Sequence, residues 1–412
     1  MTWKTELRER VTTGAALGAH ISLSDDEARQ IDSVARLFPM AIPQYYLSLM
    51  DKSDPFCPIR RQSVPDIRET VVQPGEFEDP LGEEPDSPVP AITHRYPDRA
   101  LFLVTHRCFM FCRHCNRRRK VGDARASLPL NDAAIDDGLR YLRAEKSIED
   151  VLVSGGDPLI LDTERLDWIL SRLREIPHVR TVRIGTRAPV VMPSRITDHL
   201  VAVLKKASPL WLNTHFNHPK ELTPESTSAL AKLADAGIPL GNQTVLLRGV
   251  NDCPSIIREL CVTLVAHRVR PYYLFQCDLA QGIAHFRTRI STGLEIMESM
   301  IGHVRSYAVP TFAIDPPGGA GKVPILPNYL ISQSDSAVVV RNYEGVITKY
   351  FESSAGPSEC GSGCSCRGNS EQGQRHRDAG QSVAAMLDRS GPVSLVPQGN
   401  ARELRRSKRS SD

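Results

Sequence analysis

Apolar and polar residues follow two different rhythms along this chain, and the change comes near residue 100. Beyond it, short apolar runs typical of buried strands alternate with segments whose apolar residues recur at helical spacing. The predicted strands are residues 100–105, 150–154, 181–186, 210–215, 239–246, 271–276 and 310–314, and the predicted helices are residues 131–146, 163–175, 195–207, 223–236, 255–268 and 291–307. Such alternation predicts a parallel sheet with right-handed crossovers. An open barrel and a doubly wound sheet both fit this pattern.

The remaining parts of the chain follow other patterns. The first 50 residues have a helical rhythm, and Ser24 before three acidic residues is typical of a helix N-cap with an acidic first turn. Residues 51–90 are rich in proline, aspartate and glutamate, so we expect an extended, solvated connector. We expect residues 368–412, which are polar and basic, to be poorly ordered or peripheral.

The composition is ordinary for a soluble globular protein, with 41% hydrophobic and 24% charged residues among 412. A net charge of +3 gives no reason to expect nucleic acid or an anionic membrane as a partner. No apolar run approaches the roughly 20 residues that span a bilayer, and the N-terminus turns polar at once, so we expect neither a membrane span nor a signal peptide. Ten cysteines, mostly clustered, favour metal or cluster binding in a reducing cytoplasm.

Three cysteines follow the first predicted strand at the spacing Cys108-x3-Cys112-x2-Cys115. A structural zinc site normally has four protein ligands, and a four-iron cluster also takes four, usually all cysteine. Three thiolates would therefore leave one iron open for a ligand that is not a side chain. The loop would lie at the carboxyl end of a strand, where α/β barrels place their chemistry. The alternative is a set of reduced structural thiols or a partial zinc site.

Two glycine-rich stretches follow strands further along the chain. Gly155 and Gly156 come just after the second predicted strand, where they would let the backbone approach a ligand, although an ordinary turn has the same pattern. Residues 315–322 place three glycines ahead of Lys322, which suits a phosphate nest beside a lysine that forms a Schiff base with pyridoxal 5′-phosphate. The stretch is not a nucleotide-binding P-loop, since Val323 follows the lysine. The alternative is a surface turn with a solvated lysine.

In register with other motifs, these stretches resemble the lysine 2,3-aminomutase family of radical S-adenosylmethionine enzymes. The resemblance runs from about residue 20 to about residue 366. Within that stretch, further motifs that carry it are residues 55–60, 94–99, 215–219, 241–243, 277–279, 285–288 and 327–329. It implies an open, partial parallel (β/α)6 barrel with N-terminal helical and C-terminal metal-binding extensions. The implied domains are an N-terminal helical region and connector (1–90), the barrel with the pyridoxal phosphate site (91–330), a zinc and oligomerisation segment (331–367) and a polar tail (368–412).

The resemblance also implies roles for individual residues. The ligands of a [4Fe-4S] cluster would be Cys108, Cys112 and Cys115. The residues at S-adenosylmethionine would be Gly155, Gly156, Asp157 and Gln243. The residues at pyridoxal phosphate would be Lys322, as the Schiff base, with Arg95, Tyr96 and Arg99, and two arginines suit a phosphate. The residues at the substrate would be Arg117, on its carboxylate, and Asp278 and Asp315, on its side chain. Asn116 replaces the family's usual threonine, and we expect no consequence for the cluster.

The two aspartates favour a cationic substrate. An aminomutase that acts on glutamate needs positive or neutral side chains at these positions, because like charges repel strongly in a dry site. Lysine fits two carboxylates, and arginine stays open because a guanidinium can bridge them equally well. We therefore predict an isomerase that converts L-lysine to L-β-lysine, with arginine 2,3-aminomutase as the alternative. The resemblance implies that the reduced cluster cleaves S-adenosylmethionine to a 5′-deoxyadenosyl radical, which takes hydrogen from C3 and later returns it.

The resemblance implies further partners as well. The family has a structural zinc shared between subunits, which here implies the ligands Cys253, Cys360, Cys364 and Cys366, although this trio departs from the family's C-x-C-x2-C spacing. A homo-oligomer and an electron donor such as flavodoxin or ferredoxin follow from the same resemblance. The distant alternative is a cysteine-rich zinc module that binds nucleic acid through the basic residues 117–120. It explains neither the glycine-rich lysine stretch nor the paired aspartates.

Overall fold

The computed structural model describes residues 2–121, 130–319, 321–334 and 336–352. The chain divides into two compact units, one ending at Pro327 and the other beginning at Asn328, and each is described by itself.

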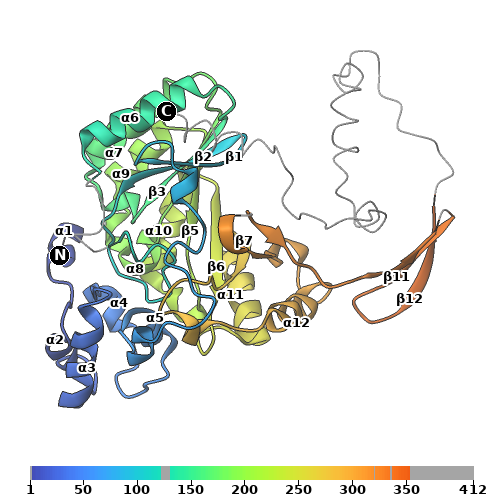
Figure 1. Cartoon of the computed structure of the whole chain (residues 1–412), viewed down its shortest axis with the longest axis horizontal. Coiled ribbons are helices and arrows are strands. Elements are labelled where there is room, and N and C mark those ends of the chain that lie inside the picture. Colours follow the sequence, from blue (N-terminus) through green and yellow to red (C-terminus); the bar gives the residue numbers. More distant parts are fainter. Residues whose placement is uncertain (1, 122–129, 320, 335, 353–412) are drawn as a thin grey trace. The chain divides into compact units, whose positions relative to one another are not determined.

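A nine-stranded sheet with the strand order β1 to β9 forms the centre of the first unit (Figure 1). Its parallel strands are β2 (Arg99–Thr105), β3 (Asp150–Gly155), β4 (Thr181–Gly185), β5 (Leu210–Thr214), β6 (Leu240–Leu246), β7 (Val269–Gln276) and β8 (Thr311–Ile314). These confirm the predicted strands. Two short antiparallel edge strands, β1 (Ile92–Tyr96) and β9 (Val323–Pro324), were not predicted. Because β1 and β9 stand at opposite ends of the strand order, the sheet is open, as the resemblance implied.

Helices connect the parallel strands and cover the sheet with apolar side chains. They are α6 (Asp132–Ala144), α7 (Thr163–Arg174), α8 (Ala188–Val191), α9 (Asp198–Lys206), α10 (Pro224–Asp235), α11 (Pro254–Ala266) and α12 (Ile290–Met300). Strand residues such as Val153 and Ile184 pack with helix residues such as Leu139 and Ile169 in one buried cluster. Helix α12 ends earlier than predicted, because Gly302 takes a positive φ of 82° that stops the helix.

The N-terminal region is helical, as predicted. Its helices are α1 (Trp3–Arg8), α2 (Gly14–Gly18), α3 (Asp25–Ala35), α4 (Gln44–Ser48) and α5 (Pro58–Ser63). Ser24 caps α3 through a capping box, in which the Glu27 amide donates to Ser24 Oγ and the Glu27 carboxylate accepts from the Ser24 amide.

The acidic segment before β1 packs into the first unit, so the expectation of a solvated connector over residues 51–90 is wrong there. Glu69, Glu76, Glu83 and Asp86 are all buried, each at most 9% exposed. A buried carboxylate is costly unless it is paired and hydrogen-bonded. Glu69 binds Arg113 and Arg118, Glu83 binds Arg117, and Asp86 binds Arg95. The acidic residues therefore tie this segment to the residues around the cysteine loop.

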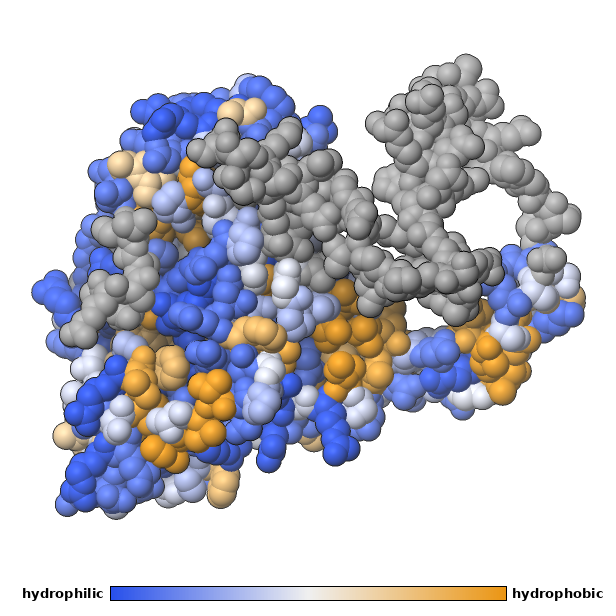
Figure 2. Space-filling view, viewed as in Figure 1, coloured by the Kyte–Doolittle hydropathy of each residue, from blue (hydrophilic) through white to orange (hydrophobic). Residues whose placement is uncertain are grey.

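The second unit contains a three-stranded antiparallel sheet of β10 (Leu330–Gln333), β11 (Ala337–Arg341) and β12 (Ile347–Phe351). Figure 2 shows apolar side chains at its surface, and Ile347, Tyr350 and Phe351 are each more than half exposed. Cys360, Cys364 and Cys366, and the polar tail, lie outside the described residues. Across the described ranges, no helix combines the length and the apolar character needed to cross a bilayer.

Candidate active site

A cavity of about 470 Å³ opens at the carboxyl ends of the parallel strands and gathers the residues predicted for the cluster, the cofactors and the substrate. The predicted residues that line it are Arg95, Tyr96, Arg99, Cys108, Cys112, Cys115, Arg117, Gly155, Gly156, Asp157, Gln243, Asp278, Asp315 and Lys322. Cys253 does not line it and lies at the N-cap of α11. Residues from widely separated parts of the chain thus meet at one place, as their positions after successive strands predict.

The cysteine loop leaves β2 and is held by its apolar residues and by Arg10. Phe109 and Met110 are buried in the core, and Arg10 Nη1 donates to the carbonyl oxygens of Cys108 and Phe109 at 2.8 and 3.1 Å. Burial and the neighbouring Cys112 raise the pKa of Cys115 to about 11. Burial likewise raises the pKa of Cys108. These thiols therefore need a bound cation to become thiolates at neutral pH.

The donor set fits a cluster better than a single ion. Within the described residues, no three Cys, His, Asp or Glu side chains converge closely enough to hold one metal ion, although all three thiols line the same cavity. In a four-iron cluster each cysteine binds a different iron, so its thiols stand farther apart than the ligands of one zinc ion.

The glycine pair at the end of β3 fixes the cysteine loop against the sheet. Gly155 has φ 130°, and a Cβ there would lie 2.1 Å from the Thr105 carbonyl oxygen. A Cβ on Gly156 would lie 2.2 Å from the Arg107 carbonyl oxygen. The amide of Gly156 donates to Thr105 O at 2.6 Å, and that of Asp157 donates to Arg107 O at 2.8 Å. The close approach of two backbones thus requires glycine here, whether or not a ligand also contacts it.

The Asp157 carboxylate is hydrogen-bonded to other groups of the protein. The carboxylate accepts from the amides of Leu159 and Arg187 at 3.0 and 2.7 Å and from Thr186 Oγ1 at 2.7 Å. Burial nevertheless raises its pKa. Asp157 therefore joins the loops after β3 and β4. Gln243, on β6, lies half-buried at the cavity.

The glycine-rich stretch places Lys322 beside Tyr96 and Asp315. The Lys322 amide donates to Tyr96 Oη at 3.0 Å, and Lys322 Nζ lies 3.0 Å from Asp315 Oδ2. Gly321 has φ 87°, and a Cβ there would lie 3.0 Å from Tyr96 Oη, so glycine lets the stretch approach the tyrosine. The Arg99 guanidinium lies over the Tyr96 ring at 4.4 Å, and Arg95 binds Asp86. Two arginines, a tyrosine and a lysine thus share one side of the cavity, a set that fits pyridoxal phosphate.

Two carboxylates face this side of the cavity. Asp278 Oδ2 accepts from Asn116 Nδ2 at 2.7 Å. Burial raises the pKa of Asp278 to about 6, and the charge of Asp315 adds to the rise. Asp315 is 8% exposed, and its Oδ1 is buried without a hydrogen-bond partner among the described residues. A buried carboxylate oxygen in this state is suited to accept from a ligand cation.

Arg117, predicted for the substrate carboxylate, is already paired. Its Nε donates to Glu83 Oε1 at 2.8 Å, and Lys120 Nζ lies 3.9 Å from Glu83 Oε2. Although burial works to raise the pKa of Glu83, Arg117 and Lys120 outweigh it and leave the pKa lowered. Glu83 was not predicted from the sequence, because it stands in the acidic segment taken for a connector.

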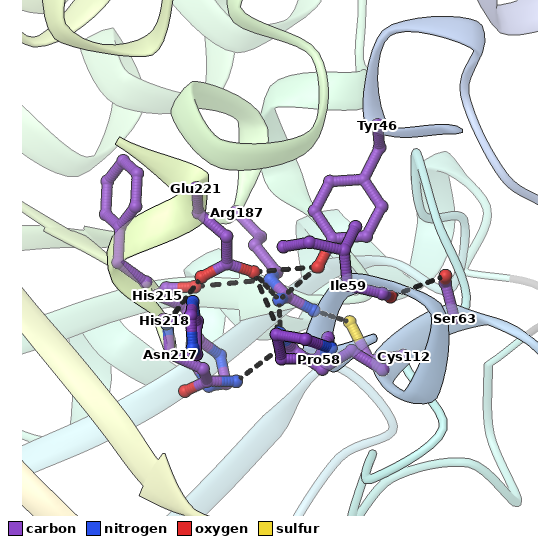
Figure 3. A network of polar contacts seen from close by, with 12 residues as sticks. Tyr46, Pro58, Ile59, Ser63, Cys112, Arg187, His215, Asn217, His218 and Glu221 are labelled. Atoms are coloured by element: carbon purple, nitrogen blue, oxygen red, sulfur yellow. Dashed lines mark hydrogen bonds and ion pairs between the residues drawn. The ribbon is translucent and has the colours of Figure 1, made fainter. Parts of the chain in front are cut away.

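A buried polar network around Cys112 was also not predicted (Figure 3). Arg187, after β4, donates from Nη1 to Cys112 Sγ at 2.8 Å and from Nη2 to Glu221 Oε1 at 2.8 Å. Tyr46, from α4, donates to the same Glu221 oxygen at 2.7 Å. The sequence feature that could have indicated Arg187 is its position directly after a predicted strand, where its side chain can reach the cavity.

Comparisons with known proteins agree with this geometry. The chain matches the family model for the radical SAM superfamily over residues 102–260 and that for lysine-2,3-aminomutase over residues 297–412. It is 49% identical to an L-lysine 2,3-aminomutase of Clostridium subterminale over 98% of this chain and 94% of that one. It is 50% identical to an L-lysine 2,3-aminomutase of Methanococcus maripaludis, over 94% and 89% of the two chains. A glutamate 2,3-aminomutase of Clostridioides difficile is 45% identical, over 84% and 82%.

Proposed function

The chain belongs to the lysine 2,3-aminomutase family of radical S-adenosylmethionine isomerases, and on that premise we propose that it converts L-lysine to L-β-lysine. Membership makes it a radical aminomutase that uses a [4Fe-4S] cluster and S-adenosylmethionine. The choice of amino acid is the proposal, since a relative named for glutamate is nearly as similar as those named for lysine.

The single observation that carries the choice of lysine is the pair of carboxylates that line the cavity, Asp278 and Asp315. The Asp315 Oδ1 atom has no partner among the described residues, and Lys322 is the only cation that binds Asp315 in those parts of the chain. A Lys322 engaged with a cofactor would no longer neutralise Asp315, so the substrate has to bring the cation. A glutamate side chain would add a third carboxylate to a dry site, where like charges repel strongly. The relatives named above lend no support to arginine.

The remaining side chains supply position. We propose that Cys108, Cys112 and Cys115 hold the cluster, and that Gly155, Gly156, Asp157 and Gln243 border S-adenosylmethionine. We propose that Lys322, Arg95, Tyr96 and Arg99 hold pyridoxal phosphate. When bound, the cluster and S-adenosylmethionine supply a radical that removes hydrogen from C3, and pyridoxal phosphate supplies a conjugated ring that stabilises the resulting radical.

Arg117 has a double task in this proposal. It would bind the substrate carboxylate while Glu83 holds the other side of its guanidinium, since a guanidinium has five donors. The α-carboxylate and the side-chain ammonium would then be bound at opposite ends of the substrate, which would fix the position of C3 within the cavity. The centroid of the Phe275 ring lies 4.8 Å from Lys322 Nζ, so an aromatic face borders the lysine.

Assembly is proposed from the second unit and from Cys253. The exposed apolar side chains of β10–β12 support a homo-oligomer in which a second copy covers this sheet. We propose that Cys253 of one subunit and the Cys360, Cys364 and Cys366 group of another share a zinc, with the domain boundaries given above. We also propose reduction of the cluster by flavodoxin or ferredoxin, in the cytoplasm.

The test is an anaerobic assay in which reconstituted enzyme receives lysine, arginine and glutamate in parallel, with chromatographic detection of the β-isomers. The proposal expects lysine to have the largest kcat/KM. A larger kcat/KM for glutamate or arginine would overturn the choice of substrate and leave the family assignment intact.

A further inference from the structure

The guanidinium of Arg187 is buried and fully engaged. Its side chain is 7% exposed, and its Nη1 donates to Cys112 Sγ at 2.8 Å (Figure 3). Nη2 donates to Gln62 Oε1 at 2.6 Å and to Glu221 Oε1 at 2.8 Å, while Nε donates to the His215 carbonyl at 3.2 Å. Each of the three nitrogens therefore has a defined partner, and one of these partners is a cysteine sulfur.

Contacts on the far side of Arg187 hold it in place without help from Cys112. Glu221 is 0% exposed, and its carboxylate accepts from Tyr46 Oη and from the amides of two neighbouring residues at 2.6 and 3.0 Å. The Arg187 amide donates to Asp157 Oδ2 at 2.7 Å, so the backbone is anchored as well. A donor fixed in this way keeps its direction toward the sulfur when the charge on that sulfur changes.

The positive charge of Arg187 is also balanced, by the negative charge of Glu221. Arg187 and Glu221 form a buried ion pair, so together they add almost no net charge near Cys112. The hydrogen bond to sulfur is therefore the main effect of Arg187 while Glu221 is ionised. Removing Glu221's charge would leave the guanidinium uncompensated beside the sulfur, in surroundings with little water to screen it.

We infer that Arg187 raises the reduction potential of the cluster and that Glu221 lowers it. The inference rests on the proposed function in one respect, which is the assignment of Cys112 as a cluster ligand. One electron passes from an external low-potential one-electron reductant to the cluster, and no bond to Arg187 forms or breaks. The reduced cluster carries one more negative charge, so a donor to its ligand sulfur stabilises the reduced form more than the oxidised form. The carboxylate of Glu221 acts on the same charge in the opposite sense.

The experiment is an anaerobic redox titration of the reconstituted holoenzyme and its variants, followed by the electron paramagnetic resonance signal of the reduced cluster. At the wild-type midpoint, Arg187→Gln should lower the ratio of reduced to oxidised cluster about tenfold, which is a shift of about 59 mV for one electron. Glu221→Gln should raise that ratio by a similar factor. The matched control is Arg195→Gln, which removes another buried arginine whose guanidinium binds the carbonyl oxygens of Leu159 and Leu161. Its midpoint should equal that of wild type.

A merely structural role would not move the two midpoints in opposite directions. Shifts of the same sign in Arg187→Gln and Glu221→Gln, or none in either, overturn the inference. If Arg187→Gln does not retain iron, Arg187→Lys replaces it, with a midpoint expected below that of wild type, and an unchanged midpoint overturns the inference. The iron and sulfide content of Cys112→Ala distinguishes a failure of the ligand assignment from a failure of the proposed tuning. A complete cluster in that variant refutes the ligand assignment, whereas a lost cluster with unmoved midpoints in the other variants refutes the tuning alone.

Discussion

Lysine should bind progressively more weakly below about pH 6, because Asp278 then takes up a proton. Burial raises the pKa of Asp278 to about 6, the hydrogen bond from Asn116 opposes this rise, and the charge of Asp315 adds to it. The carboxyl is ionised above its pKa and neutral below it, and only the ionised form attracts an ammonium. Affinity is therefore present above pH 6 and is lost as the pH falls. His215, which also lines the cavity, has a pKa lowered to about 3 by burial, so it stays neutral through this range.

The size of the effect follows from the uptake of one proton. Well below the pKa, KM should rise about tenfold for each pH unit, so that KM at pH 5 exceeds the plateau value about tenfold. The rise ends when the contribution of the ionised carboxylate is gone. Breaking a buried, hydrogen-bonded charge pair costs about 2–5 kcal/mol, and each 1.4 kcal/mol is about tenfold, so the limit lies at roughly 30-fold or more.

The assay compares the KM of lysine with the inhibition constant of 2-aminohexanoate between pH 5 and pH 8. This analogue has the carbon chain of lysine without the side-chain ammonium, so its affinity should not depend on the charge of Asp278. Titration of the cofactor's phosphate would change the KM of lysine and the inhibition constant of the analogue alike, which distinguishes it from titration of Asp278. Asp278→Asn should raise the KM of lysine at pH 8 and abolish its dependence on pH. A flat KM in the wild type, or an undiminished slope in the variant, would refute the reasoning.

Three further changes test other parts of the structure. Cys115→Ala should abolish the iron–sulfur absorbance and turnover, and a variant that retains both would exclude Cys115 as a ligand. Lys322→Ala should lose the absorbance of the pyridoxal phosphate Schiff base while its iron content stays that of the wild type; a persistent band would place the Schiff base elsewhere. Glu69→Gln leaves two buried arginines without their carboxylate, so the free energy of unfolding of the apoprotein should fall by about 3–5 kcal/mol in urea. Asp198→Asn removes a carboxylate that is 91% exposed and should change this free energy by less than about 1 kcal/mol, and equal effects would contradict the account.

The parallel strands and the cavity could be predicted because each depends on local sequence. Apolar runs such as residues 100–105 define the strands, and the polar residues after them meet at the carboxyl ends of a parallel sheet. The edge strands β1 and β9 escaped prediction because they are short and lack a continuous apolar run. Their positions depend on neighbours that are distant in sequence.

The buried ion pairs could not be predicted from composition. Glu69 and Glu83 stand in a proline-rich acidic segment, which by itself indicates solvent exposure. Their burial depends on arginines that come after the cysteine loop, and no local pattern connects the two. Asn116 gives a similar lesson. That its presence in place of threonine leaves the cluster unaffected stays a prediction, but no local pattern indicated that Asn116 donates to Asp278.

The network around Arg187 joins parts of the chain that are made at very different times during translation. It joins Tyr46, Gln62, Arg187 and Glu221, with a separation of 175 residues between Tyr46 and Glu221. Contacts between distant residues form late, because the chain between them has to be ordered first. A ribosome that has released only the cysteine loop therefore presents Cys112 without its arginine. We therefore expect a cluster that is inserted before Arg187 has been made to lack this hydrogen bond until the first unit has folded.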